Sequence, residues 1–260
     1  MRCRPAAAIL ISILTVGASA SAQSAEKKPL RTRPVVELPL IGAAAAVWIG
    51  SEALKSRLVP VTCRWCERDQ AGNVTVNGFD RAIRSALVGR GLSPPTWSRV
   101  SDVTVFGVVP LASLALDWTV GHQERLDRPF ADDAGIMAES LLAAALVDQL
   151  VKFVAARQRP FAAFDAPYAA DYHQSVGAAD DNLSFFSGHS AAALSLTVAA
   201  SRLVELRTGR RIGYAILVPL GVVASLMRIA ADKHWATDVL VGMAVGALAG
   251  YVIPSLHAGS

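Results

Sequence analysis

Two cations stand at the end of a strongly apolar stretch of the sequence. Lys152 lies within the run Leu141–Ala156, and Arg159 follows seven residues later. In a helix this spacing places both side chains on one face, two turns apart, and Pro160 would end the helix there. Ionisable groups in apolar membrane helices are costly and therefore indicate function. Two cations at the water boundary suit an anion; the alternatives are a helical ion pair with Asp148 and snorkelling surface cations.

A second group, Ser187-Gly188-His189, stands at the start of the next apolar stretch, residues 188–206. The free backbone N–H groups at a helix start bind phosphate well, and Gly188 allows close approach of the backbone. His189 is placed to exchange a proton with a bound group. The alternative is that Ser187 only caps the helix.

The third group consists of Arg228, His234 and Asp238. On a helix, His234 and Asp238 would meet on one face, where the carboxylate would fix one ring nitrogen and leave the other free to attack. Arg228 lies near them only if the helix is interrupted near residues 231–233. Capping or surface pairing could explain this group alone, but three groups at helix ends on one side favour a site.

The elements that position these groups are expected to be membrane helices. The 260 residues are 53% hydrophobic and 18% charged, against about 25% charged in an average soluble domain. Several apolar stretches approach the roughly 20 residues that span a bilayer. We therefore expect an all-α bundle of five to six transmembrane helices near residues 35–54, 101–119, 134–156, 188–206, 211–231 and 236–254. A net charge of +4 without basic, aromatic-interleaved stretches argues against nucleic acid as a partner.

The expected domain organisation has three parts. Residues 1–22 are typical of a signal peptide, with an uncleaved anchor as the alternative. Residues 23–99 would form an N-terminal helix and an extracytoplasmic loop, and residues 100–256 the catalytic domain. Cys63 and Cys66 lack the partners of a zinc site, so we expect a disulfide or free thiols in an exported loop, and no metal.

The distribution of arginines predicts how the helices are oriented across the membrane. The loop 202–211 is the most basic in the helical core, which places it in the cytoplasm and the three groups on the opposite side. A cleaved signal followed by six spanning helices would invert this arrangement. We therefore expect that helix 35–54, the weakest of the stretches, does not span.

The three groups together resemble the signature of the type-2 phosphatidic acid phosphatase family, whose superfamily includes vanadium haloperoxidases and bacterial class A acid phosphatases. The pattern Lys-x6-Arg-Pro is intact at Lys152 to Pro160. The pattern Pro-Ser-Gly-His corresponds to Phe186–His189, with Phe186 in place of proline. The pattern Ser-Arg-x5-His-x3-Asp corresponds to Met227–Asp238, with Met227 in place of serine. Both departures fall on supporting positions.

The resemblance implies roles for the matched residues. His234 would be the nucleophile that forms a phosphohistidine, Asp238 would orient it, and His189 would protonate the leaving alcohol. The phosphate oxygens would be held by Lys152, Arg159, Ser187, Gly188 and Arg228. It implies no cofactor.

The resulting hypothesis is a phosphatase of the bacterial inner membrane that acts on lipid phosphomonoesters or diphosphates at the periplasmic face. Its partners would be the lipid phosphate and membrane lipids. The alternatives are a vanadium haloperoxidase, a soluble periplasmic acid phosphatase, and a non-catalytic scaffold or transporter. The loop 161–183 could gate the substrate. The ladder Gly242, Gly246, Gly250 suits close helix packing, within the monomer or in a homodimer.

Overall fold

The protein is an all-α bundle, as the sequence predicts. The computed structural model describes residues 30–60, 62–124 and 130–259. This part of the chain contains helices and three isolated β-bridges but no β-strand. The expected signal peptide at residues 1–22 lies outside the described residues.

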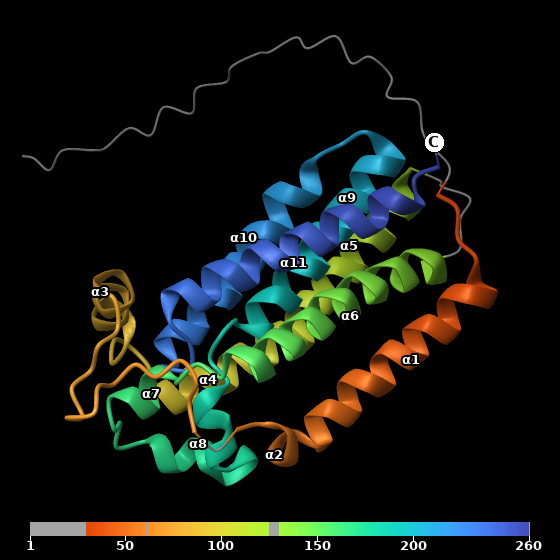
Figure 1. The fold of residues 1–260 in the computed structure, drawn as a ribbon. Coiled ribbons are helices and arrows are strands. Elements are labelled where there is room, and N and C mark those ends of the chain that lie inside the picture. The colour runs from red at the N-terminus through yellow and green to blue at the C-terminus, as the bar shows by residue number, and fades with distance from the viewer. Residues whose placement is uncertain (1–29, 61, 125–129, 260) are drawn as a thin grey trace, which may run out of the picture.

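Long helices run along the bundle, and shorter ones cluster at one end of it (Figure 1). All six expected apolar stretches are helical, and the second begins earlier than expected because residues 94–103 join it through a π-helical turn. The long helices are α1 (Pro34–Ala53), α4 (Pro94–Val103) continuing through Thr104–Val108 into α5 (Val109–Gln123), α6 (Phe130–Ala155), α9 (Gly188–Thr208), α10 (Ile212–Ala230) and α11 (Ala236–His257). The short ones are α2 (Lys55–Leu58), α3 (Gly78–Leu87), α7 (Pro160–Ala163), α8 (Ala169–Val176) and the 3-10 helix η2 (Ala178–Asn182).

Five helical segments in the described residues are long and apolar enough to cross a membrane. They are α1, the continuous stretch from α4 through α5, α6, α10 and α11. The expected number of five to six spans is confirmed. Because α1 qualifies by length and composition, the expectation that it does not span stays a prediction.

Helix α9 forms the centre of the bundle and packs against α5, α6, α10 and α11. Nearly all of its residues between Ser190 and Val204 are buried. Small alanine and serine side chains let the neighbouring helices approach it closely. The first turn of α9, with Gly188 and His189 partly exposed, is therefore continuous with the buried centre of the bundle.

The glycine ladder of α11 packs against α9 inside the monomer. Gly242, Gly246 and Gly250 are buried, and a Cβ atom on any of them would collide with the backbone of α9. The ladder thus serves close packing within the monomer, the first of the two uses expected from the sequence, and the homodimer stays a prediction.

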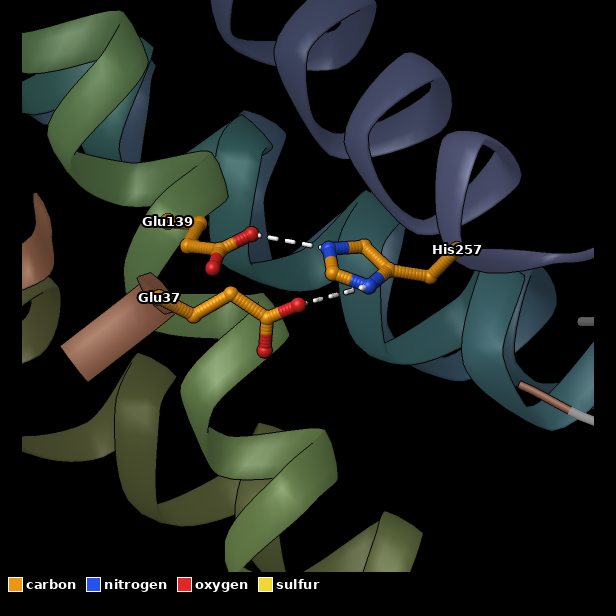
Figure 2. Close-up of side chains that lie close together, drawn as sticks. All are labelled: Glu37, Glu139 and His257. Atoms are coloured by element: carbon orange, nitrogen blue, oxygen red, sulfur yellow. Dashed lines mark hydrogen bonds and ion pairs between the residues drawn. The ribbon is translucent and has the colours of Figure 1, made fainter. Parts of the chain in front are cut away.

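Helix α1 is tied to the bundle by a histidine of α11 (Figure 2), at the end of α11 that is remote from the short helices (Figure 1). His257 of α11 places Nε2 2.8 Å from a carboxylate oxygen of Glu139 in α6. Its Nδ1 lies 2.9 Å from the backbone carbonyl oxygen of Arg31 and 3.8 Å from the carboxylate of Glu37 in α1. This one side chain thus links three helices.

The segment between α2 and α4 folds back over the end of the bundle that carries the short helices. Cys63 and Cys66 form a disulfide, one of the two states expected from the sequence. Between them, the backbone carbonyl of Trp65 accepts from the N–H of Gln158 at 3.0 Å. The segment therefore lies directly against the loop that follows α6.

The close contact between α9 and α11 predicts the effect of one methyl group. Gly246→Ala would place a Cβ against the backbone of Ala191, and we expect a loss of about 1–3 kcal/mol in the free energy of unfolding. Gly135→Ala in α6 meets nothing within 4 Å and should leave stability unchanged or raise it by up to about 1 kcal/mol. Thermal unfolding in detergent would measure both, and equal melting temperatures for the two variants would contradict the packing described.

Candidate active site

The three groups of residues identified in the sequence converge at one end of the bundle. Lys152 comes from the end of α6, Arg159 from the turn into α7, and Ser187 to His189 from the start of α9. Arg228 lies near the end of α10, and the loop between α10 and α11 carries His234. The break near residues 231–233 that the sequence requires is present, since α10 ends at Ala230.

His234 is buried and held in one tautomer. Its Nδ1 lies 2.7 Å from the backbone carbonyl oxygen of Ser184. A carbonyl can only accept, so Nδ1 carries the hydrogen and Nε2 presents its lone pair. Nε2 lies 3.2 Å from Nη1 of Arg159, among the cations of the site. The ring is therefore fixed with a nucleophilic nitrogen directed at the place where an anion would bind.

The electrostatics of the site keep His234 neutral. Burial lowers the pKa of its imidazole well below the usual value, and Arg159, Arg228 and Lys152 lower it further. At neutral pH the ring therefore has an unprotonated Nε2. A neutral imidazole is the form that can attack an electrophile.

Asp238 lies within ion-pair distance of His234, and its expected role in orienting the histidine stays a prediction. The Asp238 Oδ2 lies 3.8 Å from Nδ1 of His234 and accepts from the Ser184 hydroxyl at 2.5 Å and the Trp235 N–H at 2.8 Å. The four-residue spacing brings the two side chains near each other even though His234 lies in the loop before α11. The carboxylate caps α11 and holds Ser184, whose carbonyl in turn holds the histidine.

Arg157, which the sequence reasoning missed, anchors this arrangement. Its fully buried guanidinium lies 2.6 Å from Asp238, 2.9 Å from Asp80 and 2.6 Å from Glu67. The ring of Trp65 covers it, with its centroid 4.2 Å from Cζ. Two of the three carboxylates come from the segment before α4, so no local pattern around Arg157 could have revealed them.

His189 has a carboxylate partner that the sequence reasoning also missed. Its Nε2 lies 2.8 Å from Oδ1 of Asp102 in α4, and Nη1 of Arg228 lies 3.0 Å from the same oxygen. A signal was present, because Asp102 stands at the start of the apolar stretch 101–119, where an ionisable group is as costly as at Lys152. Asp102 thus links the second and third groups.

The cations of the site differ in how far their donors are already paired. Lys152 pairs with Asp148 at 2.9 Å, and a Cβ on Gly188 would lie 2.5 Å from that carboxylate, so only glycine fits here. The buried Nε of Arg228 has no partner among the residues that the structure describes. An unsatisfied buried donor costs free energy, and an anion would satisfy it.

Ser187 and Arg159 are more fully engaged. The Ser187 hydroxyl accepts from the Ser190 N–H at 3.4 Å and from the Ser190 hydroxyl at 2.9 Å, so it caps α9. Arg159 donates to the backbone carbonyls of Asp180 and Lys233 at 2.7 and 2.8 Å. Both residues nevertheless lie at the site end, where the sequence expects them.

One group of side chains outside this site has metal-ligating types. The ligand atoms of Glu37, Glu139 and His257 lie within 4.8 Å of one another (Figure 2). The two carboxylates approach opposite nitrogens of the ring, and Nδ1 donates to the carbonyl of Arg31. These contacts hold the histidine between α1 and α6, at the far end of the bundle from the site.

Comparison with known proteins finds a family match for the region that carries the motifs. Residues 133–259 match the model of the PAP2 superfamily, which spans all three groups of site residues. Asp102, Asp80 and Glu67 lie outside the matched range. No curated protein and no solved structure matches the chain.

The anchoring role of Arg157 predicts a large effect on stability. Arg157→Gln would leave three buried carboxylates without their cation, and we expect a loss of about 3–5 kcal/mol in unfolding free energy. Arg99→Gln, at an exposed position in α4, is the matched control and should change it by less than about 0.5 kcal/mol. Unfolding of both variants in detergent provides the measurement, and a loss below about 1 kcal/mol for Arg157→Gln would contradict this role.

Proposed function

Because residues 133–259 belong to the PAP2 superfamily, whose members are generally phosphatases, we propose that the protein is an integral membrane phosphatase that hydrolyses lipid phosphomonoesters or diphosphates. The observation that carries the proposal is the state of His234. It is neutral, it is fixed by the Ser184 carbonyl, and it presents Nε2 beside Arg159.

The reaction would proceed in two steps through a phosphohistidine. In the first, Nε2 of His234 attacks phosphorus, the bond from phosphorus to the ester oxygen breaks, and His189 gives a proton to the leaving oxygen. In the second, His189 takes a proton from water as the water oxygen attacks phosphorus. The bond from phosphorus to Nε2 then breaks and inorganic phosphate leaves.

The cations supply the electrostatic stabilisation. Lys152, Arg159 and Arg228 surround the place where charge builds up on the phosphate oxygens, and the start of α9 adds backbone donors. The free Nε of Arg228 is available to such an oxygen without breaking an existing bond. Since these donors are already buried and held, little reorganisation is needed during the reaction.

Asp102 would act on His189. Its carboxylate accepts from Nε2 and stabilises the positive charge of the doubly protonated ring, whose Nδ1 then carries the proton for the leaving group. Asp102 is itself held by Arg228, which also faces the phosphate. The general acid and one of the phosphate-binding groups are thus connected through one carboxylate.

Two features support an extracytoplasmic site in a bacterial inner membrane. The arginine-rich turn 202–211 lies at the end of the bundle opposite the site, and such turns favour the cytoplasm (Figure 1). The Cys63–Cys66 disulfide lies on the side of the site, and disulfides persist in oxidising compartments. Apolar helices around the site favour a lipid as the substrate.

Phosphate release from lipid phosphates tests the function. We expect the purified protein to release phosphate from phosphatidic acid or a polyprenyl diphosphate, and orthovanadate to inhibit it. His234→Ala should lower the rate by at least about 10⁴-fold, because the nucleophile is lost. Unchanged release by this variant would overturn the mechanism, and halide oxidation that requires vanadate would overturn the phosphatase.

The proposed action of Asp102 predicts a dependence on the leaving group. Asp102→Asn should slow hydrolysis of an alkyl phosphate by about 10–100-fold, because an alkoxide needs the proton from His189. Hydrolysis of para-nitrophenyl phosphate, whose leaving group needs little protonation, should slow far less. Equal losses for both substrates would indicate that Asp102 serves the structure only.

A further inference from the structure

One acidic side chain lies among the cations of the site. Asp180, in η2, is only 3% exposed. Its Oδ1 lies 3.0 Å from Nη2 of Arg159 and 3.7 Å from Nζ of Lys55, and its Oδ2 lies 3.5 Å from Nζ of Lys233. The carboxylate therefore occupies a position between three cations.

Two of these cations are not among the fixed residues of the motifs that identify the site. Lys55 belongs to α2, at the end of α1 and far before the matched region, and its side chain is 15% exposed. Lys233 directly precedes His234, and its Nζ lies 4.2 Å from the centre of the Tyr172 ring. The cations around His234 thus include two lysines, Lys55 and Lys233, that the family pattern does not specify. The carboxylate of Asp180 pairs with both.

The charges of the cluster respond to one another. Burial would raise the pKa of Asp180, but Arg159, Lys233 and Lys55 hold it below its usual range. Burial and Arg159 lower the pKa of Lys233 to about 8, against the effect of Asp180. At neutral pH the carboxylate is ionised and faces protonated partners.

The charge of Asp180 is not required to hold Arg159 in place. The backbone carbonyl of Asp180 accepts from Nε of Arg159 at 2.7 Å, and the carbonyl of Lys233 accepts from Nη1 at 2.8 Å. An asparagine at position 180 would still offer an oxygen to Nη2. Charge and position can therefore be separated by an isosteric substitution.

We propose that Asp180 is a specificity-determining residue, an internal counter-ion that competes with the phosphate group for Arg159, Lys233 and Lys55. This inference rests on the proposed function, because it assigns the bound anion to the same site. Nη1 of Arg159 is 3.2 Å from the nucleophilic Nε2, so a phosphate at His234 would share this arginine with Asp180.

The competition would discriminate between substrate and product. Free inorganic phosphate gains its binding energy only from the cations and the backbone donors of the site, and a carboxylate nearby weakens the attraction to the cations. A lipid phosphate also gains from contacts of its apolar chains. Asp180 would therefore favour the lipid over free phosphate and promote release of the product.

The test is the binding of inorganic phosphate to the full chain in detergent, measured by calorimetry at pH 7. Asp180→Asn should lower the dissociation constant by about tenfold, because a buried negative charge close to the anion is removed. Asp181→Asn is the matched control, since it makes the same charge change one residue away. Its carboxylate pairs with His173 at 2.7 Å instead of the site cations, and the dissociation constant should not change.

Two further variants keep the test decisive. Asp180→Glu retains the charge and should not tighten binding, whereas Asp180→Ser removes the charge and should, even if Asp180→Asn folds poorly. Unchanged or weaker binding in both neutral variants, at melting temperatures close to that of the wild type, would overturn the role of Asp180. Failure of the wild type and of both neutral variants to bind phosphate would instead contradict the proposed function.

Discussion

The arrangement of the site depends on the burial of one guanidinium. Arg157 is removed from water and must be compensated by partners, and it meets Glu67, Asp80 and Asp238 within 3 Å. Through these bonds the segment before α4 is fixed to the start of α11. Asp238, so held, fixes Ser184, and the Ser184 carbonyl sets the tautomer of His234. The buried charge of Arg157 therefore determines, through Asp238 and Ser184, how the ring of His234 is held.

The N-terminal third of the chain contributes more than its apolar helix suggests. The sequence predicts residues 23–99 as a separate helix and loop, yet Lys55 reaches Asp180 and Asp80 binds both Arg157 and Thr237. Residues before the matched region thus complete the surroundings of the matched ones. This part of the molecule can adapt the shared chemistry to one substrate, because it contacts the site from outside the motifs.

Sequence reasoning succeeds where a property is local. The apolar lengths predict the long helices, and the internal spacings predict that Lys152, His189 and Arg228 come together, because each motif lies at a helix end. It fails where the partner is distant in sequence. Asp102 lies 87 residues from His189, and Arg157 finds its carboxylates 77, 81 and 90 residues away. The hydrogen bonds of Asp238 to Ser184 and to the N–H of Trp235 were likewise not predicted, because they depend on the loop before α11 rather than on helical spacing.

The central position of α9 means that its burial depends on the helices around it. The helix is enclosed by its neighbours, and it carries hydroxyls at Ser195, Thr197 and Ser201 that bond to its own backbone carbonyls. It is not among the segments apolar and long enough to cross a membrane alone, within the part of the chain that the structure describes. Its burial is therefore provided by α5 and α6, which precede it in the chain, and by α10 and α11, which follow it. The start of α9 is thus fully packed only once α11, the last helix of the chain, lies against it.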